Sequence, residues 1–252
     1  MRVTFLGTGT STGVPVIACR CRVCSSSDPR NQRLRPSILM EWDDRKVLVD
    51  SSSDFRQQAL RHGIDRLDAV LYTHCHADHV MGLDDLRIYN FRQRSDLPVY
   101  GNPETLEEIR RTFWYAFSDT QEGGGKPRLD LRCVEGAFDL LGRRVEPVPL
   151  WHGRMPVLGY RVGGFAYCTD CNRIPESSAK ILESLDVLVI DALRNTPHPT
   201  HFCLSETLAT LEILRPRRAY LIHMGHELDH EETERTLPPS IRLAHDGLIL
   251  EI

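Results

Sequence analysis

The chain reads Thr73-His74-Cys75-His76-Ala77-Asp78-His79 directly after a short apolar run, Ala69-Val70-Leu71-Tyr72. An apolar run of this length is typical of a buried strand, so the polar stretch falls at the end of that strand. Three imidazoles and one carboxylate lie within six residues. These nitrogen and oxygen donors suit zinc, manganese or iron, and they outnumber the ligands that one open catalytic ion needs from a single segment. The stretch therefore predicts a catalytic centre with two metal ions rather than a polar loop with chance histidines.

Around this motif, runs typical of strands alternate with runs of helical periodicity. Strands are expected at Val3 to Leu6, Ser37 to Glu41, Lys46 to Val49, Ala69 to Tyr72, Pro98 to Tyr100, Arg144 to Leu150, Leu158 to Val162, Phe165 to Cys168, Val187 to Ile190, Ala219 to Ile222 and Leu248 to Ile252. Helices are expected at Asp54 to His62, Asp84 to Arg92, Thr105 to Arg111, Ser177 to Leu185 and Ser205 to Leu214, and residues 119–127 read as a mobile surface loop. This order predicts an α/β protein whose sheets are covered by helices and are not purely parallel.

Length and composition narrow the class further. The chain has 252 residues, without a linker-like stretch or a shift in composition, which predicts a single domain over residues 1–252. It is 41% hydrophobic and 26% charged, as in an ordinary soluble protein. The formal charge is −4, without the excess of positive charge that broad binding to nucleic acid or an anionic membrane requires. A small-molecule substrate is therefore expected. The apolar runs are too short to cross a bilayer and Met1 to Gly7 lacks the core of a signal peptide, which predicts a cytoplasmic protein.

Further polar residues follow other predicted strands at the point where each strand ends. They are His152 after Leu150, Asp170 after Cys168, Asp191 after Ile190, and His223 after Ile222. Loops at one edge of the sheets can bring such residues together, which is the usual position of an active site. Taken alone, His152 and His223 would each favour a buried core histidine, but their registration with the other motifs favours ligands instead.

In their order and spacing, the HxHxDH stretch and the segments Trp151-His152-Gly153, Tyr167-Cys168-Thr169-Asp170 and Leu221-Ile222-His223 resemble the metallo-β-lactamase superfamily over nearly the whole chain. The resemblance implies a four-layer αββα sandwich. It also implies a ligand set: one ion held by His74, His76 and His152, a second held by Asp78, His79 and His223, and Asp170 bridging the two.

The implied ligands set the charge of the site. Two divalent ions contribute +4, Asp78 and Asp170 subtract two and a bridging hydroxide subtracts one, which leaves about +1 and favours an anionic substrate. Water held between two such ions, zinc or manganese, is acidified and becomes the nucleophile. His74→Ala or Asp78→Ala is therefore expected to lower activity by orders of magnitude with the fold largely intact, which places Asp78 among the catalytic residues.

Three of the eight cysteines, Cys19, Cys21 and Cys24, form a CxCxxC motif. In a chain without an export signal, metal binding or free thiols are expected rather than disulfides. Three thiolates leave one position open on a tetrahedral zinc, and His226 is the strongest candidate for it. The sequence thus predicts a closed structural zinc site, with merely reduced cysteines as the alternative. A second pair, Cys168 and Cys171, flanks Asp170, and a redox or zinc-knuckle role there would compete with the aspartate for local geometry.

Four motifs together resemble the phosphoribosyl cyclic phosphodiesterase branch of carbon-phosphorus lyase metabolism. They are CxCxxC, HxHxDH, the HxxH of His223 to His226, and the opening Phe5-Leu6-Gly7-Thr8-Gly9-Thr10-Ser11-Thr12-Gly13-Val14-Pro15. That resemblance implies a homodimer and a further active-site histidine, His201, which would protonate the leaving alkoxide or orient the phosphate. His198 is a nearby competitor, and either imidazole could instead cap the helix that follows. Asp191 is expected to orient a metal-bound histidine or to be a simple strand-end aspartate.

The leading hypothesis is a metal-dependent phosphodiesterase for a small anionic, cyclic phosphodiester, for example 5-phosphoribosyl 1,2-cyclic phosphate. The tRNA-processing endonuclease branch shares the metal motifs, but the charge of −4 and the absence of a long inserted arm do not favour nucleic acid. Lactonase or thioesterase chemistry stays open, because a bridging hydroxide attacks a carbonyl as readily as phosphorus. A noncatalytic zinc-binding module predicts one ion and no hydrolysis, whereas the leading hypothesis predicts two ions in an open site and one in a closed site.

Overall fold

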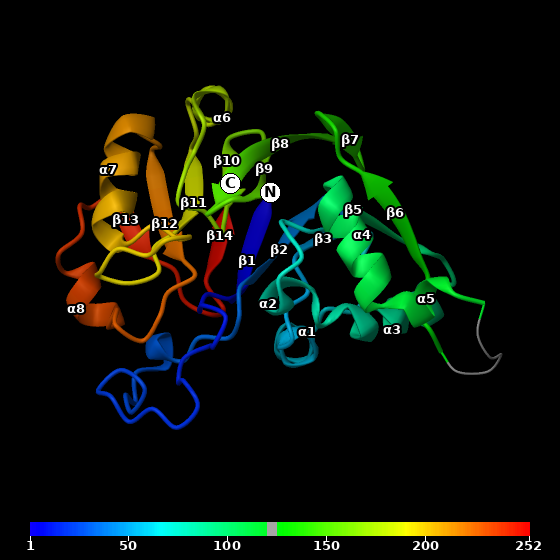
Figure 1. Cartoon of the computed structure of the whole chain (residues 1–252), viewed down its shortest axis with the longest axis horizontal. Helices are drawn as coiled ribbons and strands as arrows, with labels where there is room; N and C mark the ends of the chain where they lie inside the picture. The colour runs from blue at the N-terminus through cyan, green and yellow to red at the C-terminus, as the bar shows by residue number, and fades with distance from the viewer. Residues whose placement is uncertain (120–124) are drawn as a thin grey trace.

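The computed structural model describes residues 1–119 and 125–252, and the strands of these residues form two seven-stranded sheets (Figure 1). Most of the loop expected at residues 119–127 lies outside the described residues. The first sheet consists, in spatial order, of β14 (Ile249–Glu251), β1 (Arg2–Gly7), β2 (Ser37–Trp42), β3 (Arg45–Val49), β4 (Ala69–Leu71), β5 (Leu97–Gly101) and β6 (Leu129–Cys133). The second consists of β13 (Ile241–Leu243), β12 (Arg218–Ile222), β11 (Val187–Asp191), β10 (Phe165–Cys168), β9 (Met155–Val162), β8 (Arg143–His152) and β7 (Phe138–Leu140).

Both sheets are mixed, as the sequence predicts. In the first sheet β14, β1, β2 and β3 pair antiparallel and β3, β4, β5 and β6 pair parallel. In the second sheet β7, β8, β9 and β10 pair antiparallel and β10, β11, β12 and β13 pair parallel. Parallel strands end at the same edge of a sheet, so the residues after β3 and β4 share one edge, as do those after β10, β11 and β12.

Helices cover the outer faces of the two sheets (Figure 1). The helical segments along the chain are η1 (Pro29–Asn31), α1 (Phe55–His62), α2 (Ala77–Val80), η2 (Leu83–Leu86), α3 (Arg87–Gln93), α4 (Pro103–Thr112), α5 (Trp114–Phe117), α6 (Glu176–Ile181), α7 (Leu204–Leu214) and α8 (His230–Glu234). Phe55 of α1 and Leu106 of α4 pack against the first sheet, and Leu211 of α7 packs against the second. The expected four-layer αββα sandwich is therefore confirmed.

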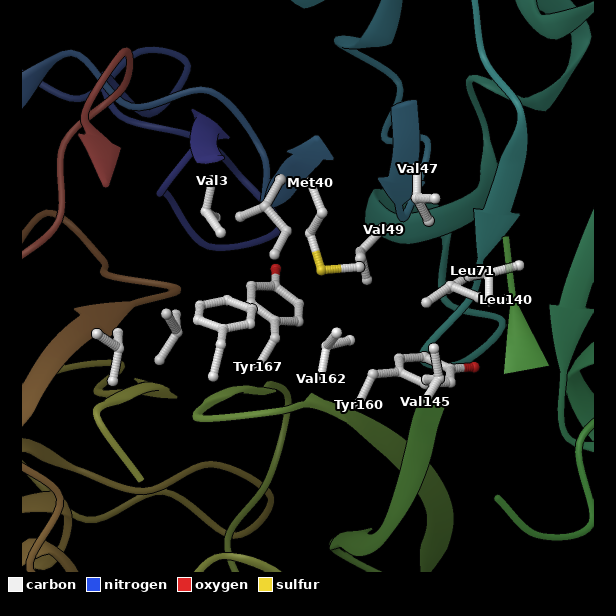
Figure 2. Close-up of a cluster of buried hydrophobic side chains, with 14 of the residues drawn as sticks. Val3, Met40, Val47, Val49, Leu71, Leu140, Val145, Tyr160, Val162 and Tyr167 are labelled. Carbon is white, nitrogen blue, oxygen red and sulfur yellow. The ribbon is translucent and has the colours of Figure 1, made fainter. Parts of the chain in front are cut away.

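The central core lies between the two sheets (Figure 2). Val3 and Val49 of the first sheet face Tyr160 and Tyr167 of the second, and all four are at most 1% exposed. Burying an aliphatic side chain of this kind contributes about 1.5 to 3 kcal/mol to stability. The Tyr160 hydroxyl donates across the interface to the carbonyl of Tyr72 at 2.7 Å, directly before the HxHxDH stretch. The core therefore fixes where that stretch begins.

Several short elements were not predicted: the strands β6, β7 and β13 and the helices α2, α5 and α8. The strands β7 and β13 have three residues each, too few to establish a period of two. The helix α8 is polar throughout and begins because the side chain of Asp229 accepts from the Glu232 amide at 3.1 Å. The helix α2 has four residues and begins inside the metal-ligand motif, which is too short a segment to show helical periodicity.

Close backbone contact explains part of the glycine-rich opening. A side chain at Gly7 would place its Cβ 2.0 Å from the carbonyl oxygen of Arg35, so the first strand can pass this segment only with glycine. Gly13 has a positive φ of 64° and its amide closes a turn onto the Thr10 carbonyl at 2.8 Å. Among the described residues, no helix combines the length and the apolar character that crossing a bilayer requires.

Asp246 joins the turn before β14 to the first loop, and it makes stability depend on pH. Its carboxylate, 4% exposed, accepts from the Thr8 hydroxyl and the Leu34 amide, both at 2.8 Å. Burial raises its pKa to about 6 from 3.8. The folded state therefore holds a proton that the unfolded chain has lost, so this group's contribution to stability falls as pH rises from about 4 to 6 and is constant above.

Asp246→Asn removes that part of the pH dependence. Between pH 4 and pH 7 the wild type is expected to lose up to about 3 kcal/mol of unfolding free energy relative to the variant. Urea unfolding at the two pH values measures the difference, and Glu183→Gln, an exposed carboxylate, is the control. Identical pH slopes in the wild type and Asp246→Asn would contradict the expectation.

Candidate metal centre

The HxHxDH stretch is held by a buried carboxylate that the sequence analysis did not single out, Asp50. It accepts from the Thr73 amide at 2.8 Å, from the Thr73 hydroxyl at 2.9 Å and from His79 Nδ1 at 2.8 Å. When Asp50 is ionised it only accepts, so His79 donates its Nδ1–H to it, and a neutral His79 ring then has the lone pair of Nε2 for the site. Asp50 directly follows β3, the parallel neighbour of β4, so the strand-end rule used elsewhere would have found it.

Three imidazoles form the first donor cluster: His74, His76 and His152, whose ligand atoms lie within 4.8 Å of one another. His74 Nε2 and His76 Nδ1 are 3.1 Å apart. His152 Nδ1 donates to the Thr200 carbonyl at 2.8 Å, which leaves Nε2 as its free donor. Burial is the main cause that lowers the pKa of His152 to about 4, so this ring is neutral near pH 7. Three imidazole nitrogens that converge in this way form a donor set typical of a catalytic zinc, so the cluster fits a metal ion.

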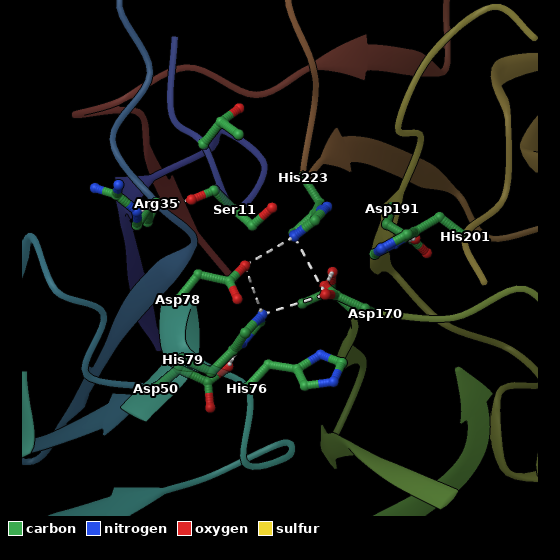
Figure 3. A network of polar contacts seen from close by, with 12 residues as sticks. Ser11, Arg35, Asp50, His76, Asp78, His79, Asp170, Asp191, His201 and His223 are labelled. Atoms are coloured by element: carbon green, nitrogen blue, oxygen red, sulfur yellow. Dashed lines mark hydrogen bonds and ion pairs between the residues drawn. The ribbon is translucent and has the colours of Figure 1, made fainter. Parts of the chain in front are cut away.

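The second donor cluster comprises Asp78, His79, Asp170 and His223, all buried (Figure 3). Asp170 Oδ2 lies 3.2 Å from both His79 Nε2 and His223 Nε2. Asp78 Oδ2 lies 3.4 Å and 3.3 Å from the same two nitrogens. Burial alone would raise the pKa of Asp170, but His223 and His79 outweigh it and hold that pKa well below its usual range.

Asp170 lies between the two clusters. The same Oδ2 is 3.7 Å from His74 Nε2, so one carboxylate oxygen faces donors of both sets. The structure thus brings together all seven residues that the sequence suggested for a binuclear site, in the two groups expected: His74, His76 and His152, and Asp78, His79 and His223, with Asp170 between them. Their nitrogen and oxygen atoms fit two divalent ions, and their roles as ligands remain a prediction.

His201 lies beside these clusters and is 8% exposed. Its ring stacks on that of His223, with centroids 4.7 Å apart, and meets the His152 ring edge-on at 4.5 Å. One of its nitrogens lies within 4.8 Å of donor atoms of His152 and Asp170. Burial lowers the pKa of His201, but its contact with Asp191 and the nearby carboxylates raise that pKa above the ordinary value.

Two expectations about this region are corrected. The histidine partner of Asp191 is His201, at 3.1 Å from Nδ1 to Oδ2, and not one of the predicted metal ligands. Neither His198 nor His201 caps the following helix, because α7 begins at Leu204 and its N-cap is Cys203, whose amide donates to Glu206 at 2.8 Å. His198 instead accepts from the Thr200 amide at 3.3 Å, with its ring 5.2 Å from that of His201.

The cysteine motif meets its predicted partner. The sulfur atoms of Cys19, Cys21 and Cys24 lie 3.3, 3.4 and 3.5 Å from His226 Nδ1. The Cys24 amide donates to Cys21 and is the main cause that lowers the pKa of that thiol to about 6. Three sulfurs and one imidazole around a common point fit a closed tetrahedral zinc site, which remains a prediction. Cys171 of the other pair donates instead to Asp191, and neither Cys168 nor Cys171 belongs to a candidate metal cluster among the described residues.

The sandwich and its paired donor clusters define a metal-dependent hydrolase domain. The chain belongs to the beta-lactamase superfamily, whose domain model matches residues 45–224. The crystal structure of a diphosphatase from the PhnP family is similar at a TM-score of 0.94 and 45% identity, covering 100% of this chain and 97% of that one. The superfamily and the branch expected from the sequence are thereby confirmed, the chain being PhnP-like.

Two curated relatives carry other names. An octanoyltransferase of Porphyromonas gingivalis is 42% identical over 98% of this chain and 51% of that protein, so the chain spans about half its length. A ribonuclease Z of Bradyrhizobium diazoefficiens is 37% identical over 34% of this chain and 30% of that protein. The family implies divalent metal ions, and neither relative's name assigns a substrate to this chain.

Proposed function

We propose that the chain hydrolyses a P–O bond of a small anionic phosphodiester, with a cyclic diester such as 5-phosphoribosyl 1,2-cyclic phosphate as the first candidate. The observation that supports it is the His201–Asp191 pair, which lies against both donor clusters. An acid at that position suits an alkoxide leaving group, which departs slowly unless it is protonated. The proposal includes two zinc or manganese ions in the open site, one zinc at the cysteines, and a homodimer.

Divalent ions held by the two clusters would lower the pKa of water and offset the negative charge of the substrate. The protein's own groups fix the geometry: Asp50 and the Thr200 carbonyl hold His79 and His152 in the tautomers that leave Nε2 free. His201 donates Nδ1–H to Asp191 and so presents Nε2 to the substrate. As the O–P bond to water forms, the attacking water releases a proton to solvent. The breaking P–O bond leaves its electron pair on the leaving oxygen, which takes the proton from protonated His201, and solvent then reprotonates His201.

A diphosphate bond is the second candidate, because the 45% identical neighbour is described as a diphosphatase. Its central P–O–P linkage requires the same attack on an anionic phosphorus. Processing of tRNA has less support, since the ribonuclease Z match covers 34% of this chain and the net charge is −4. Octanoyl transfer has less support as well, because about half of that relative lies outside the match.

A substrate panel on protein reconstituted with zinc or manganese tests the proposal. It contains ribosyl cyclic phosphates, a dinucleoside diphosphate, a lactone, a thioester and a tRNA precursor, with phosphomonoesters as the control. The proposal expects the highest kcat/KM for a cyclic phosphodiester, and a diphosphate preference would select the second candidate. Turnover confined to the lactone, the thioester or the tRNA would refute it.

His201→Ala is expected to lower kcat for an alkyl phosphodiester by about 100-fold, because it removes the general acid. The metal content, measured by plasma mass spectrometry, should stay at the wild-type value, since His201 is not in the predicted ligand set. His198→Ala is the matched control and should leave kcat within about threefold. If metal-loaded His201→Ala turned over the alkyl diester at the wild-type rate, His201 would not be the general acid.

A further inference from the structure

Cys171 lies between the donor clusters and the segment that carries His201. It is not a predicted metal ligand and it is not the proposed acid. The residue is fully buried and directly follows Asp170. Its amide and its thiol both lie 3.3 Å from the same oxygen of Asp191, Oδ1. Its carbonyl accepts from the Phe202 amide at 2.8 Å, so it also holds the backbone directly after His201.

The carboxylate of Asp191 is fully buried, and its orientation depends on these donors. Oδ1 takes the two donors of Cys171, while Oδ2 faces His201 Nδ1 at 3.1 Å. The backbone of Asp191 is fixed separately, because its carbonyl accepts from the Thr207 hydroxyl at 2.8 Å. A buried carboxylate oxygen that loses a donor is destabilised, and rotation of the group about its last bond is the motion still available to it.

We propose that Cys171 is a positioning residue: its S–H and N–H hold Asp191 in the rotamer that fixes His201 Nδ1 and thereby aims His201 Nε2 at the leaving group. This role rests on the proposed function, in which His201 protonates the leaving oxygen. The residue acts through Asp191 and does not touch the substrate.

The simpler interpretation of a buried thiol is that it fills space as a small apolar group. Cys168 provides the comparison within the same CxxC segment. It is also fully buried, and its side chain packs near Gly159 and makes no hydrogen bond within the described residues. Replacing Cys168 therefore tests loss of volume at this site, whereas replacing Cys171 tests loss of volume together with loss of the donor to Asp191.

Two phosphodiesters that differ in leaving group distinguish the two roles. A p-nitrophenolate leaves without help from an acid, whereas an alkoxide requires protonation. Cys171→Ala is expected to lower kcat about 10-fold or more for the alkyl diester and less than about threefold for the nitrophenyl diester. Cys171→Ser, which keeps a donor, should restore most of the loss, and Cys171→Val, which keeps the volume without a donor, should not.

The controls separate the possible failures. Metal content and circular dichroism should match the wild type, and Cys168→Ala should affect both diesters equally. Equal losses on the two diesters in Cys171→Ala, or a Cys171→Val enzyme as active as the wild type, would overturn the positioning role while leaving the proposed function in place. A wild type that hydrolyses neither diester would overturn the proposed function and this role with it.

Discussion

Asp170→Asn is expected to lower kcat/KM for the preferred diester by about 10⁴-fold, a loss of about 5 kcal/mol of transition-state stabilisation. Asp170 Oδ2 faces His79 and His223 at 3.2 Å and His74 at 3.7 Å. Asparagine keeps the shape of the side chain but removes its negative charge, so both predicted ions lose the donor placed between them. The Thr169 hydroxyl, which donates to the other oxygen at 2.6 Å, can still donate to an amide oxygen.

The test measures the rate, the metal content and the fold of the Asp170→Asn enzyme in the same preparation. Plasma mass spectrometry should show loss of ions from the open site, with one ion retained at the cysteines, and circular dichroism should be unchanged. Asp186→Asn, a half-exposed carboxylate paired with Arg217, is the control and should keep the wild-type rate. An Asp170→Asn enzyme with normal turnover would remove the basis for a binuclear mechanism.

The ligand residues could be predicted because side chains that bind metals directly follow predicted strands in the sequence. His74, Asp170 and His223 each follow an apolar run, and their spacing is readable without coordinates. The αββα fold came from the resemblance that these motifs carry, since periodicity alone left the number of sheets open. The short strands β7 and β13 were not predicted, because three residues are too few to show the alternation that distinguishes a strand from a loop.

The partners of the ligands were harder to predict, for a physical reason. His152 is oriented by the backbone carbonyl of Thr200, and every residue type offers such a carbonyl. Asp50 follows a predicted strand as the ligands do, but its partner, Thr73, is set only by the parallel pairing of Val49 with Leu71. The sequence predicts the strand-end position of Asp191 but not its partner, His201, because that contact depends on the segment from β11 to α7 folding back toward Cys171.

The largest effect on stability is expected from Cys21→Ser. The first loop, which carries the three cysteines, has a small apolar cluster of its own, with Val14, Val23 and Cys24 as its buried members. The ion pair of Arg22 with Glu232 is exposed on both sides and adds little. Buried Arg33 holds the end of the loop by donating to the carbonyls of Gly225 and Leu228. The cysteine-bearing part depends mainly on the thiolates and His226, and the free energy of metal binding at such a site is largely folding free energy.

Loss of one thiolate should open the predicted zinc site, reduce the ion count by one per chain and lower stability by at least about 3 kcal/mol, or a Tm shift of about 10 °C. Differential scanning calorimetry and plasma mass spectrometry measure both quantities, and limited proteolysis should cut first within residues 16–28. Cys133→Ser, an exposed thiol outside the cluster, is the matched control. Because this loop also reaches the segment after β12 through the pairing of Gly9 with Met224, next to His223, the variant should lose activity at a lower temperature than the control. An unchanged ion count and Tm in Cys21→Ser would show that the cysteines are reduced thiols without a metal.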